Sequence, residues 1–265
     1  MNFTFLGTGT STGVPQIGCQ CKICLSDNSK DKRLRASVLI SESGTNILID
    51  CGPDFRQQML RHGVNQLAHI LVTHQHYDHI GGLDDVRPMG NVNIYGEKNT
   101  LDVIEHNMPY CFGEDRYPGV PNINLQAIQT DLFYIENMPV QPIRAMHANL
   151  PILGYRFDKL AYLTDVKTIS RESIKQLAGL DVLVLNALRP QTHISHLSLS
   201  EAVELAKTIN ARETYFTHIS HDMGLHDEIN KELPKGIQLA YDGLKLGVDQ
   251  NNIGNQNITD RFSKK

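Results

Sequence analysis

The chain has 265 residues, 40% of them hydrophobic and 20% charged, which is ordinary for a globular protein. Its 25 basic and 29 acidic residues give a net charge of −4 without any lysine- or arginine-rich run, so nucleic acid is a disfavoured partner. No segment reaches the roughly 20 apolar residues that span a bilayer, and the amino-terminal residues lack the features of a signal peptide. We therefore expect a cytoplasmic protein with no membrane association.

Short apolar runs alternate along the chain with turn-forming residues and with amphipathic segments. The apolar runs predict strands at residues 3–6, 37–40, 46–49, 69–73, 92–95, 154–157, 161–164, 182–185 and 214–217. The amphipathic segments predict helices at residues 54–62, 98–107, 170–177 and 200–210. Ser198 and Glu201 form a capping-box pattern before the last of these helices. This order predicts one mixed α/β domain over residues 1–248, followed by a polar segment, 249–265, without fixed structure.

Cys19, Cys21 and Cys24 crowd the segment after the first predicted strand. They are too close together for a disulfide framework, and their spacing suits a metal ion in a reducing compartment. A tetrahedral structural zinc needs a fourth ligand in addition to three thiolates. His221 is the best candidate, and His226 is an alternative with a longer reach.

The run from His74 to His79 is the most informative stretch of the chain, because His74, His76, Asp78 and His79 follow a predicted strand directly. Imidazole nitrogens and carboxylate oxygens are natural ligands of zinc, iron and manganese. Alternate residues of an extended backbone point the same way, so His74 and His76 share one face. Asp78 and His79 lie past the turn and can face a second ion. The stretch therefore predicts a site for one or two metal ions, and a solvated surface loop is the disfavoured alternative.

The pattern His-x-His-x-Asp-His resembles the signature of the metallo-β-lactamase superfamily, and the resemblance extends over residues 1–247. It implies an αββα sandwich around a hydrolytic metal centre that holds zinc or manganese, with iron as a further option. The implied ligands are His74, His76 and His147 on one ion, Asp78, His79 and His218 on the other, and Asp165 on both. Asp50 is implied to hydrogen-bond a metal-binding histidine, because such histidines need a partner on their other nitrogen.

The predicted bridging carboxylate, Asp165, favours phosphodiester hydrolysis, since β-lactamases proper commonly lack it whereas phosphodiesterases and tRNA-processing nucleases of the superfamily carry it. The early cysteines with a late histidine resemble the closed zinc site of the phosphoribosyl cyclic phosphate phosphodiesterase family of the carbon–phosphorus lyase pathway. The coenzyme PQQ biosynthesis protein B family resembles this cysteine arrangement too. The resemblance thus implies one structural zinc in addition to the active-site ions.

His193 and His196 lie between the segments of Asp165 and His218, where related enzymes carry a general acid. Expulsion of an alkoxide is helped by a proton donor, and histidine is the common choice near neutral pH. We assign His196 as this acid, with His193 as the alternate, and Asp78 as both ligand and catalytic residue. The resemblance implies that a hydroxide shared by the ions attacks a small cyclic phosphodiester, such as 5-phosphoribosyl 1,2-cyclic phosphate.

Other functions on the same ligands stay open at this point. The alternatives are a tRNA 3′-end endonuclease, a thioesterase-like hydrolase and a non-catalytic zinc-binding protein. Residues 107–122 hold many prolines, glycines and tyrosines and predict a long loop, either an ordinary connection or a lid or dimer contact. A homodimer is expected from the resemblance alone.

Overall fold

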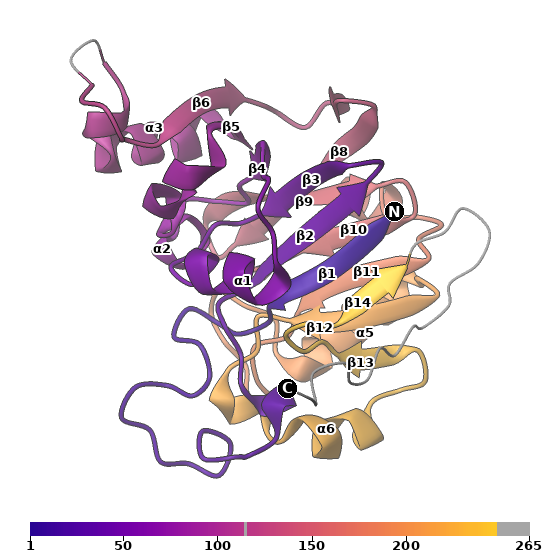
Figure 1. Ribbon diagram of the computed structural model, residues 1–265. Helices are drawn as coiled ribbons and strands as arrows, with labels where there is room; N and C mark the ends of the chain where they lie inside the picture. The colour runs from indigo at the N-terminus through magenta and orange to yellow at the C-terminus, as the bar shows by residue number, and fades with distance from the viewer. Residues whose placement is uncertain (114–115, 248–265) are drawn as a thin grey trace.

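Two seven-stranded sheets pack face to face in the computed structural model, which describes residues 1–113 and 116–247 (Figure 1). The first sheet has the strand order β14-β1-β2-β3-β4-β5-β6 and the second β13-β12-β11-β10-β9-β8-β7. The first sheet consists of β1 (Asn2–Gly7), β2 (Ser37–Glu42), β3 (Thr45–Ile49), β4 (His69–Leu71), β5 (Asn91–Gly96), β6 (Asn122–Ala127) and β14 (Lys245–Gly247). The second consists of β7 (Phe133–Ile135), β8 (Met138–His147), β9 (Leu150–Phe157), β10 (Leu160–Leu163), β11 (Val182–Asn186), β12 (Glu213–Thr217) and β13 (Ile237–Leu239).

Helices cover the outer face of each sheet (Figure 1). The α-helices are α1 (Phe55–His62), α2 (Tyr77–Ile80), α3 (Lys98–Asn107), α4 (Arg171–Lys175), α5 (Leu199–Ile209) and α6 (His226–Glu232). Short 3₁₀ helices are η1 (Ser29–Asp31), η2 (Leu83–Met89), η3 (Pro109–Cys111) and η4 (His221–Met223). The predicted αββα sandwich is therefore confirmed.

The hydrophobic core has three layers because side chains of a strand alternate between its two faces. Phe3 and Phe5 of β1 lie between the sheets with Tyr155 and Tyr162 of the second sheet. Leu6 points the other way, into the layer beneath α1 and α3. A third layer lies between the second sheet and α4, α5 and α6. Nearly continuous apolar strands result, as expected for sheets buried on both faces.

Parallel pairing brings the strand ends that carry the polar residues to one edge of the sandwich. β3 and β4 run parallel in the first sheet, and β10, β11 and β12 run parallel in the second. The two sheets are joined near this edge, where the Leu153 N–H donates to Thr73 O (3.0 Å) and Tyr155 Oη donates to Val72 O (2.7 Å). Residues that follow these strands can therefore meet across the sheets.

Each predicted strand and helix occurs, with ends that differ by a few residues. The Ser198–Glu201 capping box is present at the start of α5. The sequence reading missed β6, β7, β8, β13 and β14 and the short helices α2 and α6. β8 contains Pro139 and Pro142, and proline cannot donate to a ladder, yet β8 pairs with both β7 and β9.

The predicted loop at residues 107–122 contains η3 and ends at the first residue of β6. Tyr110 Oη donates to Asp84 Oδ1 (2.7 Å), and Arg87 Nη1 donates to Gly119 O (2.9 Å), so η2 supports this loop. A lid or dimer role for it stays a prediction. The predicted polar segment, 249–265, lies outside the described residues. Among the helices within residues 1–113 and 116–247, none is long and apolar enough to cross a bilayer.

Candidate metal centre

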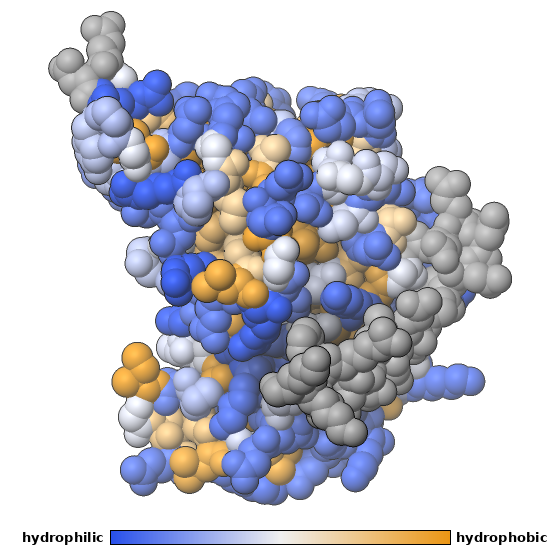
Figure 2. Space-filling model, viewed as in Figure 1, coloured by the Kyte–Doolittle hydropathy of each residue, from blue (hydrophilic) through white to orange (hydrophobic). Residues whose placement is uncertain are grey.

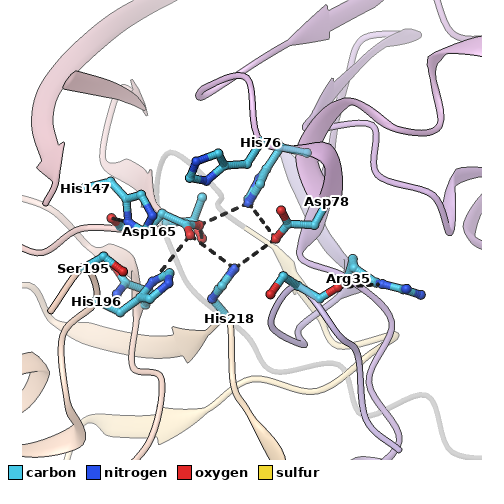
Figure 3. A network of polar contacts seen from close by, with 12 residues as sticks. Arg35, His76, Asp78, His147, Asp165, Ser195, His196 and His218 are labelled. Atoms are coloured by element: carbon cyan, nitrogen blue, oxygen red, sulfur yellow. Dashed lines mark hydrogen bonds and ion pairs between the residues drawn. The ribbon is translucent and has the colours of Figure 1, made fainter. Parts of the chain in front are cut away.

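Histidines and carboxylates from both sheets meet at the carboxyl ends of the strands (Figure 3). The segment after β4 supplies His74, His76, Asp78 and His79, and the second sheet supplies the remainder. The second-sheet residues are His147 at the end of β8, Asp165 after β10, His196 before α5 and His218 after β12. In Figure 3 the Asp165 carboxylate lies between His196 and His218, and Asp78 faces His218 from the other side. All predicted ligands of the dinuclear site thus lie in one neighbourhood.

Three of the site residues turn sharply into this edge. Asp50, Asp165 and His218 have φ of 64°, 59° and 56°, in the left-handed region that residues with a Cβ seldom adopt. Such a conformation costs on the order of 1–3 kcal/mol and persists where the surroundings impose it. Asn186 helps to impose it beside Asp165, because its side chain accepts from Val166 N (2.7 Å) and donates to Val166 O (3.0 Å).

Hydrogen bonds fix three imidazole rings through their Nδ1 atoms. His79 Nδ1 donates to Asp50 Oδ2 (2.7 Å), and His147 Nδ1 donates to the backbone oxygen of Asp165 (2.9 Å). Thr73 Oγ1 donates to Asp50 Oδ2 (2.9 Å), which leaves it to accept from His74 Nδ1 (2.9 Å). In the neutral form of each ring, the lone pair is then on Nε2. Asp50 therefore lies where the resemblance placed it, behind a site histidine.

One half of the site is formed by His79, His218 and two carboxylates. His79 Nε2 lies 3.3 Å from both Asp78 Oδ2 and Asp165 Oδ2. His218 Nε2 lies 3.5 Å from Asp78 Oδ2 and 3.3 Å from Asp165 Oδ1. Asp165 thus presents a different oxygen to each histidine. These atoms converge as the ligands of one cation would.

The other half is formed by His74, His76 and His147. His74 Nε2 lies 3.0 Å from His76 Nδ1, and the ring of His147 has its centre 5.6 Å and 5.1 Å from those of His74 and His76. Two nitrogens that bind one ion at about 2.0–2.1 Å would be separated by about 3.0–3.4 Å. The spacing of His74 and His76 therefore fits a shared ion.

Buried polar atoms give an independent test of whether a cation fits. His79 Nε2, His196 Nδ1 and both ring nitrogens of His218 are buried and have no hydrogen-bond partner among the described residues. Buried polar atoms are normally paired, so each such atom calls for an explanation. A divalent cation would satisfy the Nε2 atoms of His79 and His218, and neutral imidazole with ionised carboxylate is the donor set that such a cation takes.

The charges of the site point the same way. Burial alone would raise the pKa of Asp165, but the charges of His218 and His79 hold that pKa well below its usual range. Burial would also raise the pKa of Asp78, but the charge of His79 lowers it. Burial lowers the pKa of His74 well below its ordinary value, so this ring is neutral. Two ionised carboxylates and a neutral His74 ring are the forms that bind metal, whereas the charges of Asp50, Asp78 and Asp165 raise the pKa of His79 despite its burial, so this ring would release a proton to a bound ion.

His196 lies against this cluster. Its Nδ1 is 3.4 Å from Asp165 Oδ1, and its ring centre is 4.5 Å from that of His147 and 4.9 Å from that of His218. Burial, followed by the charge of His218, lowers the pKa of His196 to about 3. His193 lies one step further out, with its ring centre 5.1 Å from that of His196 and its Nδ1 accepting from the Ser195 N–H (3.3 Å).

A second cluster lies on the loop after β1. His221 Nδ1 is 3.3, 3.4 and 3.5 Å from the sulfurs of Cys19, Cys21 and Cys24. A tetrahedral zinc with Zn–S of about 2.3 Å and Zn–N of about 2.0–2.1 Å would separate sulfur and nitrogen by about 3.5 Å. The four residues therefore fit a closed zinc site in which His221 would be the fourth ligand.

The rival fourth ligand, His226, is occupied elsewhere. Its Nδ1 lies 3.1 Å from Arg33 Nη2 and its Nε2 lies 2.9 Å from Asn230 Nδ2. Burial, followed by the charge of Arg33, lowers the pKa of His226 to about 4.

Around the cysteines, the Cys24 N–H lowers the pKa of Cys21 to about 6, whereas burial raises the pKa of Cys24 to about 11.

Sequence reasoning missed several residues that support the site. Thr164 Oγ1 donates to Asp165 Oδ2 (2.7 Å), and Thr73 supports both Asp50 and His74. Gly52 admits the backbone of Asp78, since a Cβ there would lie 2.1 Å from the Asp78 carbonyl oxygen. Asn186 is a polar residue at the end of an apolar run, as Asp50 is, so the same sequence pattern could have identified it. The two threonines carry no signal of this kind.

A family model described as a beta-lactamase superfamily domain matches residues 45–219, more than half of the chain. The chain therefore belongs to the β-lactamase superfamily, whose fold binds divalent metal and serves hydrolases. This confirms the superfamily and the fold that the His-x-His-x-Asp-His pattern predicted.

Among solved structures, a new diphosphatase from the PhnP family is 41% identical, with a TM-score of 0.88 over 94% of this chain and 98% of that chain. Zinc-bound PqqB from Methylobacterium extorquens shares the fold, at 21% identity and a TM-score of 0.77 over 94% of this chain and 100% of that one. An octanoyltransferase of Porphyromonas gingivalis is 42% identical over 259 residues, 96% of this chain and 53% of that protein. The chain thus spans about half of the length of that curated relative.

Proposed function

We propose that this protein is a phosphodiesterase that uses two divalent metal ions to hydrolyse a small cyclic phosphodiester, such as 5-phosphoribosyl 1,2-cyclic phosphate. The observation that carries the proposal is the position of Asp165. One oxygen of its buried carboxylate lies 3.3 Å from His79 Nε2 and the other 3.3 Å from His218 Nε2, and the carboxylate also lies within 4.8 Å of a ring nitrogen of His74 and of His147, so it reaches the residues of both halves. A carboxylate between two cation sites suits in-line displacement at phosphorus. The 41% identity to a diphosphatase supports chemistry at phosphorus.

The proposed ligands follow from the two halves of the site. His74, His76 and His147 would hold one ion, Asp78, His79 and His218 the other, and Asp165 both. When bound, the ions would supply a nucleophile from water at neutral pH and neutralise charge that develops on the phosphoryl group. Manganese and zinc both suit this donor set, with iron as a further option. The four residues Cys19, Cys21, Cys24 and His221 would hold a structural zinc.

The protein's own residues would orient the site and move the proton. Asp50 keeps His79 in the tautomer that leaves Nε2 free, and Thr164 fixes one oxygen of Asp165. His196 would donate a proton to the departing alkoxide, because its ring borders Asp165, His147 and His218 without any other partner for Nδ1 in the described residues. An anionic phosphodiester beside the ring would raise the pKa of His196 and so promote the protonated form.

Phosphorus NMR of the metal-replete protein with 5-phosphoribosyl 1,2-cyclic phosphate tests the proposal. We expect the cyclic diester resonance to be replaced by that of a monoester, and a chelator to stop the conversion. Persistence of the cyclic diester with both metal sites loaded would contradict the proposed substrate. An RNA with a 3′ extension serves as the comparison for the nuclease alternative, and we expect it to stay uncut.

The replacement His196→Ala is expected to slow turnover of an alkyl cyclic phosphodiester by about 10²–10⁴-fold, the usual contribution of a general acid. A diester that releases p-nitrophenolate should be affected much less, because that leaving group needs no proton. Metal content, measured by mass spectrometry, should be unchanged. Loss of metal together with loss of both activities would make His196 a ligand instead.

Two other histidines sharpen this comparison. His106→Ala, on the exposed side of α3, removes an imidazole away from the site and is expected to leave both rates unchanged. His193→Ala is expected to change the kcat of the two reactions in the same proportion. A selective loss of kcat on the alkyl substrate in His193→Ala would transfer the role of general acid to His193.

A diphosphate is the second candidate substrate, because the 41% identical structure is that of a diphosphatase. Its leaving group is a phosphate, which departs more readily than an alkoxide, so His196→Ala should slow diphosphate hydrolysis only slightly.

The octanoyltransferase name belongs to a protein of which this chain matches about half. A cytoplasmic location and a homodimer remain proposals that follow from the sequence resemblance.

A further inference from the structure

Arg189 lies between the two segments that bring His196 and His218 into the site. Its backbone oxygen accepts from Leu199 N (2.8 Å), and the neighbouring Leu188 pairs with Leu197 (3.0 Å), which follows His196. On its other side, Leu188 O accepts from Ser220 N (3.0 Å), two residues after His218. The segment of Arg189 is therefore held at the rim of the metal centre by the same chain segments that carry site histidines.

The guanidinium group of Arg189 is poorly satisfied for a residue in that position. Its recorded side-chain contact is an ion pair of 3.4 Å with Asp222, whose side chain is 47% exposed. Its Nε is buried and has no hydrogen-bond partner among residues 1–113 and 116–247. A guanidinium has five N–H donors in a planar fork that matches phosphate oxygens in pairs. An anion at the rim would satisfy the donors that the protein leaves open.

His193 connects this arginine with the centre of the site. The ring centres of His147 and His196 are 4.5 Å apart, and those of His196 and His193 are 5.1 Å apart, so the rings form a row that leads outward from Asp165. Arg189 is close enough to lower the pKa of His193, second only to burial. His193 Nδ1 accepts from Ser195 N (3.3 Å), so the proton of the neutral ring is on Nε2. The row therefore ends at His193, a neutral donor on the same short chain segment as the permanent cation of Arg189.

We propose that Arg189, with His193 beside it, forms a subsite for a second anionic group of the substrate. The substrate class is then a small phosphodiester or diphosphate that carries a terminal phosphate, with the scissile phosphorus at the metal centre and the terminal phosphate at the rim. The inference rests on the proposed function. It adds a residue that selects the substrate without taking part in bond cleavage.

The test compares two substrates that differ only in the terminal group, 5-phosphoribosyl 1,2-cyclic phosphate and ribosyl 1,2-cyclic phosphate with a free 5-hydroxyl. The metal-replete wild-type protein should have a higher kcat/KM on the phosphorylated one. Arg189→Gln should lower kcat/KM on that substrate by about 10–100-fold, as expected for loss of a charge-assisted hydrogen bond, chiefly through KM. On the 5-hydroxyl substrate the change should stay below about twofold.

Two further variants make the comparison specific. Arg189→Lys keeps the charge without the fork and should fall between the wild type and Arg189→Gln. Lys207→Gln removes a positive charge from the exposed face of α5 and should leave kcat/KM unchanged on both substrates. Circular dichroism and metal content of each variant establish that the fold is intact.

The possible failures are distinguishable. Equal losses of Arg189→Gln on both substrates would overturn the subsite and leave Arg189 a structural residue. Equal kcat/KM of the wild type on both substrates would also overturn it, while the proposed phosphodiesterase activity would stand. Hydrolysis of neither substrate by the wild type would overturn the proposed function, and this inference with it.

Discussion

Asp165→Asn is expected to lower phosphodiesterase activity by at least about 100-fold, more than the loss of an outer partner of a metal ligand costs. The replacement keeps the shape of the side chain but removes the charge that lies 3.3 Å from both His79 and His218 and 3.4 Å from His196. Both ions should bind more weakly, because Asp165 is the residue that the two proposed sites share. Metal content by mass spectrometry and the phosphorus NMR assay measure the two effects.

Asp102→Asn is the matched control, since it makes the same change of charge on the exposed face of α3 and should alter neither property. Raising the metal concentration should recover part of the activity of Asp165→Asn if weaker binding is the cause. Full activity of this variant at ordinary metal concentration would contradict the bridging role.

Cys21→Ala is expected to remove the structural zinc and to lower Tm by about 5–10 °C. The cluster joins residues 19–24 to His221 across a sequence separation of about 200 residues. A covalent cross-link that closes so long a loop contributes about 2–5 kcal/mol, and about 3 kcal/mol in a chain of this size corresponds to that shift in Tm. Calorimetry and zinc content measure the outcome.

Cys111→Ala provides the comparison, because Cys111 is buried in the core away from the cluster. It should cost some packing energy but leave the zinc content unchanged. A Cys21→Ala variant that retains a full zinc complement would show that the cysteines do not hold the ion. A variant that loses zinc without a fall in Tm would show that the ion is not structural.

The sequence was enough to predict the fold and to select residues that meet in space, because both rest on local patterns. Apolar runs identified most strands, and the His74–His79 stretch keeps its neighbours together whatever the tertiary structure. Asp50 and Asp165 were recognisable as acids at strand ends. Parallel pairing then brings such ends to one edge, so the site followed from the order of the elements.

The remainder depends on tertiary contacts that no local pattern carries. β8 contains two prolines and is a strand because β7 and β9 flank it. The left-handed backbone at Asp50, Asp165 and His218 is imposed by neighbours such as Asn186, and the residue types at these positions do not predict it. No local sequence pattern singles out Arg189, because the lack of a partner for its buried Nε among the described residues is a property of the folded chain.

The site is assembled from both sheets, with His74, His76, Asp78 and His79 on one side and His147, Asp165 and His218 on the other. The Tyr155–Val72 hydrogen bond joins the sheets directly behind it. An ion in this position would fasten the two halves of the chain to each other, since it binds only where they are docked. Metal affinity therefore depends on how tightly the two sheets pack against each other. A substitution in the core layer of Phe3 and Tyr162 would lower metal affinity although neither residue contacts a ligand.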